Sequence, residues 1–189
     1  SIYPRSLDEQ IVAEVLLDHH STATPDKIVV IVDGTNLKRG FLLLTQIIDL
    51  GLPTILALNM MDLAAKAGIS YDFNKLSKEL GIPVVPINAR NGVGLEELKR
   101  QISIPLDPPK KIIFSIWKEA EAAVNDLREK LGIDNNYEAY QFLEQPNSLK
   151  FLSQENQQRV SRIRSQYDFF PGKFQGAETI QRYGFIQDL

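Results

Sequence analysis

The sequence has 189 residues, of which 43% are hydrophobic and 24% are charged, with a net charge of −3 and an isoelectric point near 5.5. This balance is typical of soluble globular proteins, and it offers no basic surface for nucleic acid. Cysteine is absent, which excludes disulfides, zinc fingers and iron–sulfur clusters built from this chain. No apolar run approaches the roughly 18 residues that a membrane-spanning helix needs.

A helix is predicted near the start of the chain. Ser6 precedes Glu9 by three residues, which is the spacing of a capping box. Apolar residues then recur every three or four positions, as on one buried helix face: Leu7, Ile11, Val12, Val15 and Leu16. The pattern ends near His19 and His20, which cannot share a helix face and have no third ligand nearby, so a metal site is not expected.

Three apolar segments predict strands, and helical patterns alternate with them. The strands are expected at residues 27–33, 53–59 and 82–88, and the helices at 37–50, 63–67, 73–80 and 95–102. The β-branched run from Lys27 to Asp33 is typical of a strand buried on both faces. Alternating strands and helices indicate an α/β fold with a parallel sheet, because crossover connections are right-handed.

Three prolines mark a boundary after this region: Pro105, Pro108 and Pro109. We therefore expect one domain over residues 1–104 and a small all-α subdomain over residues 105–189. Its helices are predicted at 114–131, 137–143, 153–167 and 177–186. Aromatic residues of this part are interpreted as its core and not as a stacking platform: Trp117, Tyr137, Tyr140 and Phe142.

The segment from Asn59 to Asp62 has the chemistry of guanine recognition. It follows a predicted strand, and open α/β sheets bind ligands at the carboxyl ends of their strands. The Asp62 carboxylate can accept from guanine N1–H and N2–H₂, while the Asn59 carboxamide can serve the O6/N7 side. Met60 can cover the face of the ring. The spacing alone is common by chance, and a turn with two polar residues explains it equally well.

The end of the third predicted strand carries a second such element. Asn88, Ala89 and Arg90 are followed by Gly92 and Gly94. This loop resembles the Ser-Ala-Lys loop of guanine-nucleotide-binding proteins, whose Ala N–H donates to guanine O6. The resemblance implies base-binding roles for Asn88, Ala89 and Arg90, although Asn88 replaces a commoner Ser or Thr. Together the two motifs predict a guanine-binding half-domain.

Three longer segments carry a closer resemblance. They are residues 3–12, which begin Tyr-Pro-Arg-Ser-Leu, residues 32–62, and residues 182–186, Arg-Tyr-Gly-Phe-Ile. All three are similar to the cytosolic GTPase region of the bacterial ferrous iron transport protein B (FeoB) family. Met60 is distinctive, since most small GTPases have Lys at that position. The resemblance covers essentially the whole chain and implies part of a P-loop GTPase-like sheet, followed by that family's helical regulatory subdomain.

The phosphate-binding parts of such a GTPase do not occur in this sequence. It contains no Gly-x-x-x-x-Gly-Lys-Ser/Thr loop, no switch threonine and no Asp-x-x-Gly. These parts cradle the phosphates, hold Mg²⁺ and position water. In the family they lie upstream of the residue that matches Ser1, so we expect upstream residues that were lost or omitted. No catalytic residue is expected in this chain, and Mg²⁺ is expected only with those upstream residues.

The resemblance also implies a function for the intact protein. It would bind GTP and GDP, hydrolyse GTP slowly and thereby gate ferrous-iron uptake through a membrane-embedded permease domain of the same polypeptide. Its place would be the cytoplasmic face of the bacterial inner membrane. Residues 6–15 would form the helix after the second switch. Without the upstream strands, residues 27–33 would be a bare edge through which copies of the chain associate.

Two other interpretations remain open from the sequence. One is a degenerate, non-catalytic scaffold used for protein interaction, which also predicts the missing phosphate loop. The other is a flavodoxin-like domain, which leaves the agreement of Asn59, Asp62 and Ala89 to chance. A phosphate loop encoded upstream would favour the GTPase.

Overall fold

The computed structural model describes residues 2–4, 6–18 and 24–189, so His19 and His20 lie outside the described residues. The chain divides into two compact units, each discontinuous in sequence. The α/β unit comprises Asp26–Ile113 and Arg182–Leu189, and the helical unit comprises Ser1–Pro25 and Phe114–Gln181. Every helix among the described residues is too short or too polar to cross a lipid bilayer.

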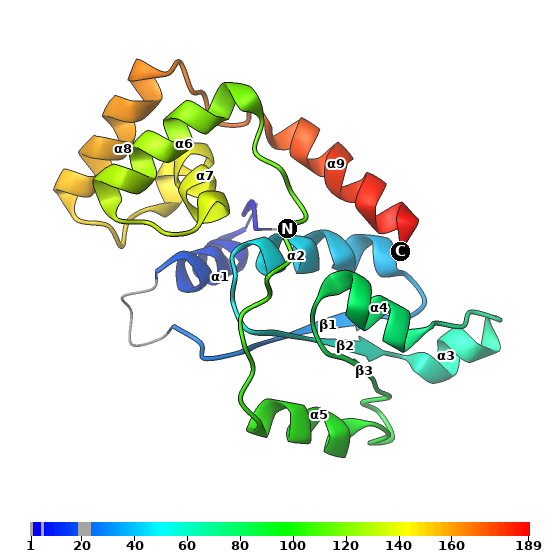
Figure 1. Cartoon of the computed structure of the whole chain (residues 1–189). Coiled ribbons are helices and arrows are strands. Elements are labelled where there is room, and N and C mark those ends of the chain that lie inside the picture. The colour runs from blue at the N-terminus through cyan, green and yellow to red at the C-terminus, as the bar shows by residue number, and fades with distance from the viewer. Residues whose placement is uncertain (1, 5, 19–23) are drawn as a thin grey trace. The chain divides into compact units, whose positions relative to one another are not determined.

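A parallel three-stranded sheet forms the centre of the α/β unit (Figure 1). Its strands run in the order β1 (Ile28–Asp33), β2 (Thr54–Asn59) and β3 (Val84–Pro86). The connecting helices are α2 (Leu37–Asp49), α3 (Met61–Lys66), α4 (Phe73–Leu80) and α5 (Leu95–Ser103). Helices α2 and α5 lie on opposite faces of the sheet. The predicted α/β fold with a parallel sheet is confirmed, and α4 has the predicted bounds.

The core of this unit is centred on β2, whose residues from Thr54 to Leu58 are all buried. On the side of α5, a buried cluster packs against Leu95 and Leu98 of that helix: Ile55, Ala57, Val85 and Ile87. On the other side, α2 approaches β1 closely, since a Cβ added to Gly40 would lie 2.6 Å from a methyl group of Val32. The two helices thus enclose β2 from both faces.

The prediction that β1 is buried on both faces is wrong. Val30 and Val32 are buried, but Ile31 between them is 63% exposed. Side chains of a strand alternate between the two faces, and α5 covers the neighbouring strands without reaching Ile31. A β-branched run therefore does not by itself establish burial on both sides.

Helix α1 (Leu7–Leu17) begins as predicted, because the Ser6 hydroxyl accepts from the Glu9 N–H at 3.3 Å. Of its predicted buried face, Leu16 is buried as predicted, but the rest of the face is largely wrong. Leu7, Ile11 and Val12 are exposed, and the buried residues are Ala13, Leu16 and Leu17. The buried side of the helix therefore carries Ala13, Leu16 and Leu17, and the apolar residues nearer its start lie outside the core.

The helical unit contains the remaining helices. They are α6 (Lys118–Leu131), α7 (Asn136–Glu144), the 3₁₀ turn η1 (Pro146–Ser148), α8 (Gln154–Gln166) and the first part of α9 (Gln175–Asp188). Tyr137, Tyr140 and Phe142 are buried as predicted, but Trp117 is 37% exposed. The prediction for Trp117 is wrong because α6 begins only at Lys118, so the indole precedes the helix and does not join its packed face.

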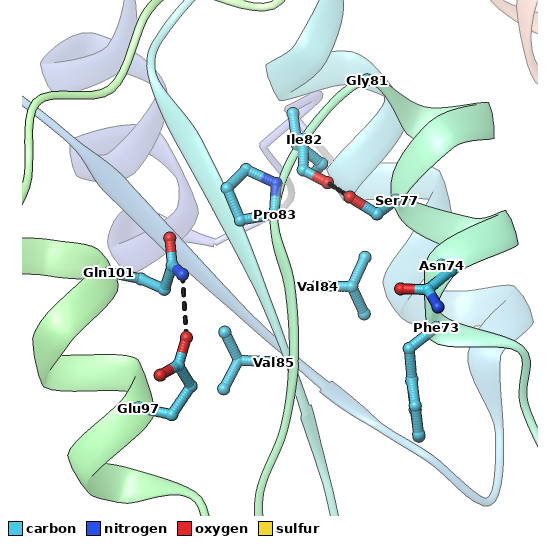
Figure 2. A pocket seen from close by; sticks show the side chains of 10 residues that line it. All are labelled: Phe73, Asn74, Ser77, Gly81, Ile82, Pro83, Val84, Val85, Glu97 and Gln101. Atoms are coloured by element: carbon cyan, nitrogen blue, oxygen red, sulfur yellow. Dashed lines mark hydrogen bonds between the residues drawn. The ribbon is translucent and has the colours of Figure 1, made fainter.

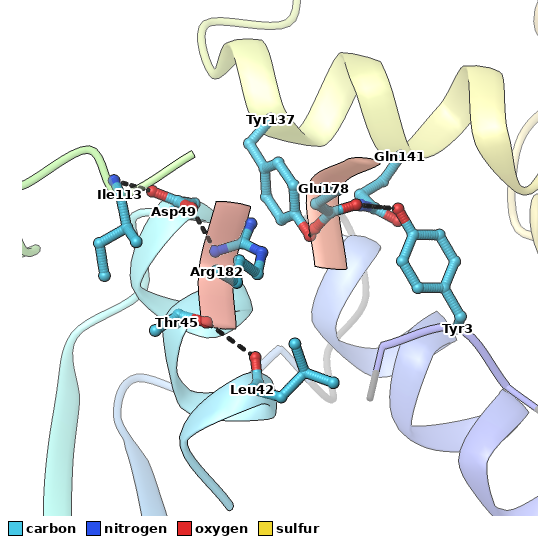
Figure 3. Close-up of polar contacts among 9 residues, drawn as sticks. All are labelled: Tyr3, Leu42, Thr45, Asp49, Ile113, Tyr137, Gln141, Glu178 and Arg182. Atoms are coloured by element: carbon cyan, nitrogen blue, oxygen red, sulfur yellow. Dashed lines mark hydrogen bonds and ion pairs between the residues drawn. The ribbon is translucent and has the colours of Figure 1, made fainter. Parts of the chain in front are cut away.

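Helix α9 continues from the helical unit into the α/β unit, the division falling between Gln181 and Arg182. Within the α/β unit, Arg182 Nη1 donates to Asp49 Oδ2 at 2.7 Å, and both side chains are buried (Figure 3). The other oxygen of Asp49 accepts from the Ile113 N–H at 2.7 Å. Asp49 therefore fixes both the linker after α5 and the end of α9 to α2.

Candidate functional site

The two predicted motifs meet at the carboxyl edge of the sheet. Asn59 ends β2, and the chain after β3 continues alongside it, with the Ile87 N–H donating to the Leu58 carbonyl at 2.7 Å. Asn59 Oδ1 accepts from the Ala89 N–H at 3.0 Å. A side chain from the first motif thus binds the backbone of the second, although 30 residues separate them.

Asp62 lies on the first turn of α3, beside this contact. Met60 precedes the helix in a left-handed conformation, with φ of 61°. A non-glycine residue rarely adopts this conformation, which here turns the chain sharply from β2 into α3. The Asp62 carboxylate is exposed and forms no hydrogen bond to another described residue. Its acceptor oxygens are therefore available to a ligand.

A hollow of about 360 Å³ opens next to Asp62. Its lining combines the Asp62 carboxylate and two carboxamides with apolar side chains: Met61, Asp62, Pro86, Ile87, Asn88, Asn91 and Val93. Such a lining suits a flat ring that is apolar on its faces and carries N–H donors on one edge. Met61 is part of it, whereas Met60, Asn59, Ala89 and Arg90 are not, and Met60 is 41% exposed.

A tight loop forms one wall of the hollow. The buried Asn88 donates its N–H to the Val93 carbonyl at 2.8 Å, and its own carbonyl accepts from the Gly92 N–H at 3.0 Å. Gly94 closes the loop with φ of 80°, and a Cβ there would lie 2.2 Å from the Pro86 carbonyl oxygen. Only glycine fits at this position, so the loop has a defined shape although its tip is exposed.

The hydrogen bond between Asn59 and Ala89 determines which of their donors and acceptors remain available to bind a base. Since Asn59 Oδ1 already accepts a hydrogen bond, its Nδ2 group is the part left to donate to a ring acceptor. The Ala89 N–H, expected to donate to guanine O6, is directed at Asn59 in this structure. A guanine O6 would have to share that N–H with Asn59.

Other groups at this edge were not singled out from the sequence. The Gly34 N–H donates to the Asn59 carbonyl at 2.8 Å, and the Tyr71 hydroxyl donates to the Gly34 carbonyl at 2.5 Å. Asp33 accepts from both the N–H and the hydroxyl of Thr35, and these bonds lower the pKa of its carboxyl group. Together they brace the backbone that presents Asn59. Gly34 and Thr35 lie in the segment 32–62, but no pattern marked Tyr71.

A second hollow, of about 450 Å³, lies over β3 between α4 and α5 (Figure 2). Its carboxylate, Glu97, accepts from Arg100 and Gln101, which lowers the pKa of Glu97 to about 2. Its hydroxyl, that of Ser77, donates to the Ile82 carbonyl at 2.7 Å. The reactive groups of this hollow are engaged in local bonds, so it is a poorer candidate for ligand chemistry than the hollow at Asp62.

Among the residues that the structure describes, no group of three or more histidine, aspartate or glutamate side chains could hold a metal ion.

Comparison with known proteins identifies the family. The family model described as ferrous iron transport protein B matches residues 1–102. The Fe(2+) transporter FeoB of Leptospira biflexa is 36% identical over 161 residues, which are 85% of this chain and 22% of that protein. The chain thus spans about a fifth of the length of that relative.

Solved structures agree with this family. The cytosolic domain of L. pneumophila FeoB has a TM-score of 0.74 at 27% identity, covering 99% of this chain and 75% of that one. A variant of S. thermophilus NFeoB bound to GDP has a TM-score of 0.69 at 26% identity, covering 100% of this chain and 76% of that one. The predicted family and fold class are therefore confirmed, and the chain belongs to the ferrous iron transport protein B family.

Proposed function

We propose that this chain supplies part of a GTP-binding and GTP-hydrolysing cytosolic region of a ferrous-iron transporter. Residues 1–104 would contain the guanine-recognition half, and residues 105–189 would form the helical coupling subdomain. The observation that carries the proposal is the bond from Ala89 N–H to Asn59 Oδ1, which unites both base-recognition motifs beside the open Asp62 carboxylate. The GDP bound to the S. thermophilus relative supports the same ligand class.

Each site residue has a distinct role in this proposal. Asp62 accepts from guanine N1–H and N2–H₂, and Asn59 donates through Nδ2 toward N7 and O6. The loop of Asn88, Ala89 and Arg90 flanks the O6 side. An apolar methionine covers the ring, with Met61 already in the wall of the hollow and Met60 exposed beside it.

In this proposal, residues outside this chain bind the phosphates and carry out GTP hydrolysis. GTP hydrolysis needs a phosphate loop, Mg²⁺ and a positioned water, and this sequence contains no phosphate-loop motif. We infer that upstream residues supply them and that this chain has no catalytic residue. The partner would be a membrane-embedded iron-permease domain of the same polypeptide, with the cytosolic region at the cytoplasmic face of the bacterial inner membrane and Fe²⁺ as the cargo.

The decisive experiment compares GDP with ADP binding by titration calorimetry, using this chain and a chain extended by its natural upstream residues. The extended chain is expected to bind GDP at least tenfold more tightly than ADP, and the short chain to bind both weakly. This result follows because base recognition lies here whereas most phosphate contacts lie upstream.

The same comparison of the two chains also tests the rival interpretation, a non-catalytic scaffold. If the extended chain does not discriminate GDP from ADP, guanine recognition by Asn59 and Asp62 is wrong, and a non-catalytic scaffold becomes the better description.

A further inference from the structure

Tyr71 connects the loop after α3 to the end of β1. The loop first turns back on α3, since the Ile69 N–H donates to the Ala64 carbonyl at 2.9 Å. The Tyr71 hydroxyl then donates to the Gly34 carbonyl at 2.5 Å, although 37 residues separate them. Gly34 directly follows β1, so a side chain from beyond α3 binds the backbone at the carboxyl edge of the sheet.

These bonds close a ring that contains α3. The Gly34 N–H donates to the Asn59 carbonyl at 2.8 Å, and Asn59 leads through Met60 into the helix. The helix is therefore held at its start through Asn59 and after its end through Tyr71, and both connections meet at Gly34. With only six residues, α3 depends on such tertiary contacts for its stability. Asp62 lies on its first turn.

Gly34 also packs directly against the residues that lead into α3. A Cβ added to Gly34 would lie 2.9 Å from Met61 Sδ and 2.9 Å from the Asn59 carbonyl oxygen. Met61 is part of the wall of the hollow at Asp62. A movement of Gly34 would therefore displace the wall of the hollow together with the start of the helix.

We propose that Tyr71 is a positioning residue for guanine recognition: its bond to Gly34 sets the direction of α3 and thereby the place of Asp62. This rests on the proposed function, in which Asp62 accepts from guanine N1–H and N2–H₂. A hydrogen bond weakens steeply when donor and acceptor lose their alignment, so a displaced Asp62 would bind the N2 amino group poorly. Tyr71 does not line the hollow and acts through Asp62.

The test compares GDP with inosine diphosphate, whose base lacks the N2 amino group, on the chain extended by its natural upstream residues. Titration calorimetry gives both dissociation constants, and their ratio reports the contact between Asp62 and N2–H₂. The parent should prefer GDP by about tenfold or more, as expected for one hydrogen bond to a charged group. Tyr71→Phe keeps the ring and removes the hydroxyl, and it should lower this preference by about threefold or more.

Ser77→Ala is the matched control. The Ser77 hydroxyl also donates to a backbone carbonyl of the α/β unit, that of Ile82, at 2.7 Å. The substitution removes the same type of bond from α4 and β3 and leaves the ring around α3 intact. It should leave the preference for GDP over inosine diphosphate unchanged.

Gly34→Ala gives a second route if Tyr71→Phe does not fold. The added Cβ must displace Met61 or the Asn59 carbonyl, so the preference for GDP should again fall. An unchanged preference in both variants would overturn the proposal, as would an equal fall in Ser77→Ala.

The two dissociation constants also separate positioning from a general loss of stability. If Tyr71→Phe weakens GDP and inosine diphosphate by the same factor, Tyr71 does not place Asp62 and the proposal is wrong. If instead the parent extended chain binds GDP no more tightly than ADP, the proposed function itself has failed.

Discussion

At the scale of single residues, the proposed function makes Asp62 the residue that selects the base. Asp62→Asn replaces a double acceptor by a group with one acceptor and one donor, and the new donor opposes guanine N2–H₂ but matches the C2 carbonyl of xanthine. We expect the extended chain to lose about 1.5–3 kcal/mol of GDP binding, the range for a hydrogen bond to a charged group, and to gain affinity for xanthosine diphosphate. Competitive titration with both nucleotides measures the change.

Asp107→Asn is the control for this substitution. Asp107 is also an exposed aspartate of the α/β unit, but it does not line the hollow at Asp62. It should leave both affinities unchanged. Unaltered GDP affinity in Asp62→Asn would show that Asp62 does not read the base.

The sequence predicted which residues meet at this site, but not how they bind one another. Strand ends of a parallel sheet lie on one edge, so Asn59, Asp62 and Ala89 could be placed together from the motifs alone. The bond from Ala89 to Asn59 Oδ1 and the entry of Met61 into the wall depend on the left-handed turn at Met60. The sequence could not predict this turn, because glycine and asparagine usually adopt the left-handed conformation and methionine rarely does.

At the scale of elements, β1 is exposed to pairing. It bonds to β2 on one side, forms the end of the sheet among the described residues, and carries the exposed Ile31. We propose that copies of this chain associate through the edge from Lys27 to Asp33 when the upstream strands are absent. Ile31→Lys should then reduce the solution mass toward that of a monomer, since charge blunts an edge strand. Light scattering after gel filtration measures the mass.

Ile112→Lys is the matched control, because Ile112 is an even more exposed isoleucine that lies outside the strands. It should leave the mass unchanged. A monomeric mass for the parent chain would contradict the association through β1.

Elements were best predicted where a local signal sets their limits. The α4 helix ends at Gly81, and α1 begins with the Ser6 cap, and both follow from short-range chemistry. Burial was predicted less well, since it depends on the partner that covers each face. Leu7 and Ile31 are apolar and yet exposed, because no described element packs over them.

At the scale of the whole molecule, the predicted boundary before Pro105 divides the chain by its sequence pattern, and the compact units divide it by contacts in space. The prolines mark a change of pattern along the chain, whereas the units depend on contacts between distant segments. The first residues group with the helices, and the last eight, from Arg182 onward, group with the sheet. The pairing of Asp49 with Arg182 over 133 residues has no local signal, so the sequence could not reveal it.

Removing one partner of this buried pair should destabilise the protein. Arg182→Met should lower the free energy of unfolding by about 3–5 kcal/mol, because it leaves the buried Asp49 carboxylate without its cation. The double variant Asp49→Leu, Arg182→Met should recover part of this loss, since replacing both charges by apolar groups is often neutral whereas the buried Ile113 N–H loses its acceptor. Urea unfolding measures all three free energies.

Arg159→Met provides the contrast, because Arg159 pairs with the largely exposed Glu155 at 2.5 Å. Its loss should stay below about 1 kcal/mol. If Arg182→Met and Arg159→Met cost the same, the buried pair does not hold the end of α9 to the α/β unit. A large cost for Arg182→Met that the double variant relieves would show that the loss comes from the unpaired Asp49 carboxylate in the protein interior.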